Sequence, residues 1–106
     1  PYKVHICPLR IDDQNVREKA FALYDTLMKK GVNVLRDDRE NVSNGVKFAD
    51  ADLMGMPIRV VVSPRGLQND EIEVTDRATL MAEKVKYEDA ISYIDAMMAR
   101  KYEELK

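Results

Sequence analysis

Cysteine, histidine and glycine are all scarce in this chain of 106 residues. Cys7 is the single cysteine, so an internal disulfide is excluded and a reducing, cytoplasmic compartment is expected. One cysteine and one histidine cannot build a zinc site by themselves. The four glycines stand apart from one another, so there is no glycine-rich phosphate loop. We therefore expect no ATP site, metal site or other cofactor within this chain.

Long apolar runs and a basic excess are missing as well. No stretch approaches the roughly 18 to 20 apolar residues of a membrane span, and no charged-then-apolar leader opens the sequence. The 17 basic and 19 acidic residues give a net charge of −2, which argues against a binder of bulk polyanions, DNA included. A protein that reads a few nucleotides remains open, because the local placement of charge decides that case.

What the chain does contain is typical of one globular domain over residues 1–106, with 45% hydrophobic and 34% charged residues. Because the first residue is Pro1 rather than Met, we expect a piece of a longer protein. Hydrophobic periodicity predicts strands at 2–9, 32–35, 58–62, 71–76 and 78–86, and helices at 11–31, 46–54 and 87–106. The composition of 63–70 predicts a turn.

Local signals refine the two long helices. Asp12 or Asp13 is a capping candidate for the first. Apolar residues at helical spacing are expected to face inward; they are Val16, Ala20, Leu23, Tyr24, Leu27 and Met28 in the first helix and Ala90, Ile91, Ile94, Met97 and Met98 in the last. The order β-α-β-α-β-β-β-α implies a sheet that begins parallel and ends antiparallel.

Sites in open α/β sheets lie beyond the carboxyl ends of the parallel strands. Leu9, 36–39 and 63–65 fall at that edge, which we call the rim. A magnesium site at Asp37 and Asp38 would need further acids at neighbouring strand ends, and the sequence offers none there. His5 could pair with Cys7 as a nucleophile, but a buried core histidine is the favoured interpretation.

The charged residues of 37–39 and 47–52 have the chemistry needed to read unstacked guanines. Ionised Asp accepts hydrogen bonds from guanine N1–H and N2–H₂, while Arg and Lys donate to O6 and N7. RNA bases are read in this way when they are splayed out of a loop. Phe48, next to Lys47, could offer a stacking face.

A motif series runs through residues 35–67: DDR, then G-x-K-F, an acidic short helix, and G-x-P-x-R before a β-branched strand. This series resembles the C-terminal anticodon-binding domain of bacterial-type prolyl-tRNA synthetases. The resemblance implies a three-layer α/β fold, with a five-stranded mixed sheet and three helices, appended to a class II catalytic core. It implies docking of the anticodon loop of proline tRNA, whose anticodon carries two invariant guanines.

Carried over by motif, the first anticodon-binding candidates are Asp37, Asp38, Arg39 and Lys47, and the second set is Arg36, Phe48, Asp50 and Arg65. Alternative roles are a loop-capping Asp38, a core Phe48 and a solvent-facing Asp50. The catalytic motifs lie outside these residues, so ATP and Mg²⁺ would serve the parent enzyme, expected to be a homodimer built through its core. Two other hypotheses stay open: a free-standing paralogue acting as an accessory or protein-interaction subunit, and a flavodoxin-like or receiver-like domain binding metal or a nucleotide.

Overall fold

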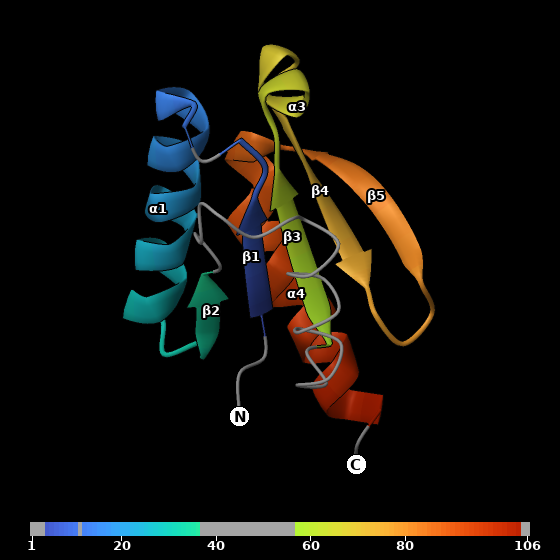
Figure 1. Ribbon diagram of the computed structural model, residues 1–106. Helices are drawn as coiled ribbons and strands as arrows, with labels where there is room; N and C mark the ends of the chain where they lie inside the picture. The colour runs from blue at the N-terminus through green and yellow to red at the C-terminus, as the bar shows by residue number, and fades with distance from the viewer. Residues whose placement is uncertain (1–3, 11, 37–56, 105–106) are drawn as a thin grey trace.

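The computed structural model describes residues 4–10, 12–36 and 57–104, with side chains described up to residue 101. A five-stranded sheet of order β2-β1-β3-β4-β5 forms its centre (Figure 1). The strands are β1 (Val4–Pro8), β2 (Val34–Arg36), β3 (Ile58–Val62), β4 (Glu71–Asp76) and β5 (Met81–Lys86). β1 pairs in parallel with β2 and β3, whereas β3–β4 and β4–β5 are antiparallel. The predicted change from parallel to antiparallel pairing is confirmed.

The antiparallel half of the sheet rules out the flavodoxin-like or receiver-like alternative. Those folds use a wholly parallel sheet, but here β4 and β5 return as a hairpin. The prediction of a strand over 78–86 was too long, because residues 77–80 form a turn. In this turn the Asp76 carboxylate accepts from the backbone N–H of Ala78 at 2.9 Å, and Leu80 takes a left-handed φ of 63°.

Helix α1 (Gln14–Lys29) begins where Asp13 caps it: the carboxylate accepts from the backbone N–H of Val16 at 3.1 Å. Gly31, with φ of 83°, follows its end, as left-handed residues commonly do. The buried stripe is Val16, Ala20, Leu23 and Leu27, with Tyr24 half-buried at its margin. The inward placement of Met28 was wrong, since its side chain is 46% exposed. One residue beyond Leu27, it is turned about 100° away from the stripe.

Helix α4 (Ala90–Glu104) follows a single 3₁₀ turn, η1 (Tyr87–Asp89). Ala90, Ile94 and Met97 are buried, and Ile91 and Met98 pack beside them. α1 and α4 share one face of the sheet, because their apolar residues join one core with every second residue of the strands: Val4, Ile6, Ile58, Val60, Val62, Ile72, Val74 and Val85.

Helix α3 (Pro64–Gln68) corrects the predicted turn over 63–70. Ser63 caps it by accepting from the backbone N–H of Gly66 at 3.0 Å, and Pro64 occupies the first turn. Ser followed by Pro is a helix-start signal as well as a turn signal, and burial of Leu67 stabilises the helical alternative. In Figure 1, α3 lies beyond the carboxyl end of β3, at the end of the sheet opposite the last described turns of α4.

The predicted α/β fold, with a five-stranded mixed sheet and three helices, is confirmed. The predicted helix over 46–54 lies outside the described residues. Among the helices that the structure does describe, none has both the length and the hydropathy required to cross a bilayer.

Candidate nucleic-acid interface

The rim is where the carboxyl ends of β1, β2 and β3 meet, because these three strands are parallel. The backbone N–H of Leu9 donates to the carbonyl of Val62 at 2.8 Å, which ties the loop after β1 to the end of β3. Arg36 is the last residue of β2, and Arg65 lies on α3 directly after β3. The structure therefore places the described part of the predicted rim, Leu9, Arg36 and 63–65, at one edge of the sheet.

Six of the eight anticodon-binding candidates lie outside the described residues, and their roles stay predictions: Asp37, Asp38, Arg39, Lys47, Phe48 and Asp50. The structure describes the other two candidates, Arg36 and Arg65.

Arg36 packs on two aromatic side chains of α1. Its guanidinium carbon lies 4.7 Å from the centroid of the Phe21 ring and 4.9 Å from that of Tyr24. The two rings are 6.4 Å apart and tilted by 49°. Contacts of this kind are cation–π interactions, which hold an arginine by its flat face. Arg36 is thus oriented toward α1, a contact that strand periodicity gave no means of predicting.

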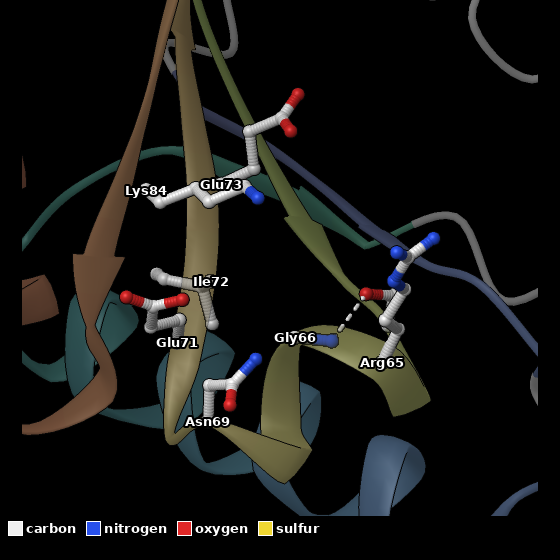
Figure 2. A pocket seen from close by; sticks show the side chains of 8 residues that line it. Arg65, Gly66, Asn69, Glu71, Ile72, Glu73 and Lys84 are labelled. Atoms are coloured by element: carbon white, nitrogen blue, oxygen red, sulfur yellow. Dashed lines mark hydrogen bonds between the residues drawn. The ribbon is translucent and has the colours of Figure 1, made fainter.

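Arg65 lines a cavity of about 340 Å³ at the rim (Figure 2). The cavity lies between α3 and the strands β4 and β5, and the residues that line it with Arg65 are Ser63, Gly66, Asn69, Glu71, Ile72, Glu73 and Lys84. We call it the rim cavity. Sequence reasoning missed Glu71, Glu73 and Lys84, because polar residues that alternate along a strand indicate an ordinary solvent-facing side.

The rim cavity gathers two carboxylates and two cations. Glu71 and Glu73 are half-buried, whereas Arg65 and Lys84 are exposed. Glu73 and Lys84 are direct cross-strand partners on β4 and β5, so their side chains project from the same face of the sheet. Within the described part of the chain, none of these four side chains makes a hydrogen bond or an ion pair. All four side chains line the rim cavity.

The wall of the cavity is held by a close approach of α3 to β4. A Cβ added at Gly66 would lie 2.8 Å from the carbonyl oxygen of Glu71 and 3.1 Å from Ser63 Oγ, distances that no side chain tolerates without a shift. Lys86 Nζ donates to the carbonyl of Asn69 at 3.0 Å and closes the turn between them. The backbone of the α3–β4 wall is therefore held by the Gly66–Glu71 approach and by the hydrogen bond from Lys86.

His5 and Cys7 are fully buried, as the core interpretation predicted. Neither is accessible to a substrate, so a Cys–His nucleophile finds no support. In the described ranges, no three His, Cys, Asp or Glu side chains are grouped so as to hold a metal ion.

The class of protein follows from the family comparison. The model of the anticodon binding domain matches residues 3–97, nearly the whole chain, and the chain belongs to this family. The same family was indicated by the motif series of residues 35–67, and that prediction is confirmed.

Individual relatives narrow the class to one kind of synthetase. Proline–tRNA ligase of Desulfitobacterium hafniense is 44% identical over 92% of this chain and 17% of its own length. The enzymes of Dehalococcoides mccartyi and Zymomonas mobilis are 43% and 41% identical over 91% of this chain, which is 17% and 21% of their lengths. The chain is an anticodon-binding domain of the proline–tRNA ligase type, and it spans about a fifth or less of the relatives that it matches.

Proposed function

We propose that this domain binds the anticodon loop of proline tRNA at its rim and reads the anticodon guanines for a proline–tRNA ligase. The family match and the ligase relatives support this function. The observation that carries it is the rim cavity, which is lined by Arg65 and three further charged side chains that make no ion pair with another described residue. Proline ligation, with its ATP and Mg²⁺, belongs to the rest of a homodimeric cytoplasmic parent.

The proposed roles follow from guanine chemistry. Arg65 donates to O6 and N7, the contact that Arg makes most often with this base. Arg36, held on the α1 aromatic rings, directs positive charge to the same edge of the sheet. The other six candidates, Asp37, Asp38, Arg39, Lys47, Phe48 and Asp50, keep their predicted roles as carboxylate acceptors, cationic donors and a stacking face.

A net charge of −2 is compatible with this function. Salt dependence grows with the number of phosphates that a protein neutralises. A domain that reads splayed bases contacts few phosphates, so its affinity should fall only modestly as salt rises.

The direct test is binding of the full chain to a proline anticodon stem-loop, beside a stem-loop with both anticodon guanines replaced by adenine. We expect the native loop to bind more tightly, and Arg65→Ala to weaken its binding by about 1–3 kcal/mol. Arg100→Ala is the matched control, because Arg100 is an exposed arginine of α4 that lines a different cavity. Equal binding of the two loops by the wild-type chain would overturn the proposal.

No observation favours the free-standing accessory subunit. The relatives are ligases in which this domain is one part of a longer chain.

A further inference from the structure

The rim cavity has a charge pattern that selects a kind of ligand. Glu71 and Glu73 contribute two negative charges, and Arg65 and Lys84 contribute two positive ones. A phosphate placed there would meet two carboxylates, and a simple cation would meet two positively charged side chains. A neutral ligand with a donor edge and a separate acceptor edge satisfies both signs at once.

Among the RNA bases, guanine has this pattern most completely. Its N1–H and N2–H₂ point the same way and suit one carboxylate, while O6 and N7 accept from a cation. Adenine presents an unprotonated N1 beside its amino group, and cytosine presents N3 and O2, so each would turn a lone pair toward the carboxylate. Uracil offers a single N–H between two carbonyls. The cavity therefore favours guanine over the other three bases.

Glu73 is the carboxylate best placed for this contact. It lies in the middle of β4, paired with Val61 of β3 on one side and with Lys84 of β5 on the other. A side chain on a strand held from both sides is positioned more precisely than one on a loop. Glu71 instead begins the strand, opposite Lys86. Figure 2 shows Glu73 and Lys84 extending from the two strands, with Arg65 across the hollow on α3.

We propose that Glu73 accepts from N1–H and N2–H₂ of one anticodon guanine in the rim cavity, while Arg65 donates to the O6 and N7 edge. Lys84 supplies the compensating positive charge beside Glu73. This inference rests on the proposed function, because the guanine is taken from the anticodon loop. It adds a specificity-determining carboxylate from the antiparallel half of the sheet to a rim otherwise built from the parallel half.

The test pairs one substitution with one base analogue. Glu73→Gln keeps the shape of the side chain and removes its charge. Inosine keeps the guanine ring and lacks only the N2 amino group. Each anticodon guanine of the stem-loop is replaced by inosine in turn, and binding to the full chain is measured. We expect the wild-type domain to lose roughly 5- to 150-fold at one of the two positions, the range of one good bidentate base contact.

For the Glu73→Gln variant we expect that preference for guanine over inosine to disappear, with weaker binding to the native loop. Glu83→Gln is the matched control: the same change on the neighbouring strand, where the side chain bonds Tyr93 of α4 on the opposite face. This control should keep the full preference. Far-ultraviolet circular dichroism should be unchanged in Glu73→Gln, since its carboxylate makes no bond within the described structure.

Failure of the proposed function and failure of the Glu73 role alone give different binding results. A wild-type chain that binds guanine and adenine loops equally, or binds neither at millimolar concentration, overturns the proposed function and this inference together. A chain that prefers guanine to adenine, but keeps its inosine discrimination after Glu73→Gln, overturns only the role of Glu73. If Glu73→Gln weakens binding of the guanine loop and of the inosine loop by the same factor, Glu73 does not read the N2 amino group. That result also overturns its proposed role.

Discussion

Two cavities of nearly equal size lie at opposite parts of the β4–β5 hairpin. Charged side chains in one of them bond to one another, whereas the four charged side chains that line the other form no such bonds among the described residues. The rim cavity measures about 340 Å³, and the second about 330 Å³. We call the second the hairpin cavity; its lining is Asp76, Thr79, Met81, Glu83, Tyr93, Met97, Arg100 and Lys101. In the hairpin cavity, Lys101 Nζ lies 2.6 Å from an Asp76 oxygen, and the Tyr93 hydroxyl donates to Glu83 at 2.8 Å.

The difference separates a site that holds the fold from a site available to a ligand. The Lys101–Asp76 pair joins the end of α4 to the hairpin turn, and its side chains are only 18% and 23% exposed. The hydrogen bond from Lys101 is the main cause that lowers the pKa of Asp76, and the backbone N–H of Ala78 adds to it. The Glu83 carboxylate likewise raises the pKa of the Tyr93 hydroxyl that bonds it. The charges of the rim cavity have no such partners in the described residues.

The largest effect is expected where the rim cavity depends on backbone. Gly66→Ala should lower the free energy of unfolding by about 1–3 kcal/mol, because the new methyl group would overlap the carbonyl of Glu71. It should also weaken binding of the anticodon stem-loop, since α3 must move. Urea unfolding monitored by circular dichroism measures the first effect. Gln68→Ala, an exposed change on the same helix, should stay within about 0.5 kcal/mol; an equal loss in both variants would contradict the steric explanation.

One substitution in each cavity should separate stability from RNA binding. Asp76→Asn should lower the free energy of unfolding by about 1–2 kcal/mol, because it removes the negative charge from a charge-assisted hydrogen bond with Lys101 that is mostly shielded from water. It should leave RNA affinity unchanged. Glu73→Gln should do the reverse, with a stability change within about 0.5 kcal/mol. Chemical denaturation and stem-loop titration of both variants measure this, and a variant affected in both assays would break the comparison.

Acid should destabilise the folded domain through Asp76 of the hairpin cavity. Because the pKa of Asp76 is lowered in the folded state, its stabilising contribution is complete above the unfolded value of about 3.9 and is lost as pH falls through the lower folded value. Between pH 5 and pH 2.5 the wild-type Tm should therefore fall more steeply than that of Asp76→Asn. Thermal denaturation across this range measures the difference. Parallel profiles would show that Asp76 is not linked to stability.

The smallest effect on stability is expected at the hydrogen bond between Tyr93 and Glu83 in the hairpin cavity. Tyr93→Phe removes the hydroxyl that donates to Glu83, and the lost stability should be about 0.5–1 kcal/mol because Glu83 is exposed to water. Urea unfolding measures it, with Glu83→Gln as the partner change. A loss above about 2 kcal/mol would mean that this bond is as important as the Lys101–Asp76 pair.

Part of the fold was predictable because local patterns and the final packing agree. The strands over 58–62 and 71–76 have the bounds that alternation and β-branching predict. Asp13 was one of two capping candidates and is the one that caps α1. Where local signals are ambiguous, as for Ser63 and Pro64, burial of Leu67 selected a helix over a turn. The predicted strand over 78–86 included residues 78–80, but the hydrogen bonds that Asp76 accepts from Ala78 and Leu80 stabilise a turn there.

The sequence by itself determined the class of this domain, because the motif series over residues 35–67 and the strand and helix periods are local properties of the chain. The order of strands and helices along the chain also predicted which edge of the sheet forms the rim. Only the tertiary structure decided that Arg65, Glu73 and Lys84 surround one cavity, since that depends on α3 closing against β4 and on the register of β4 with β5. The hairpin turn over 77–80 fixes the register that pairs Glu73 with Lys84, and strand alternation alone does not locate that turn. The approach of α3 to β4 depends on packing in three dimensions, which the periodicity of a single element does not contain.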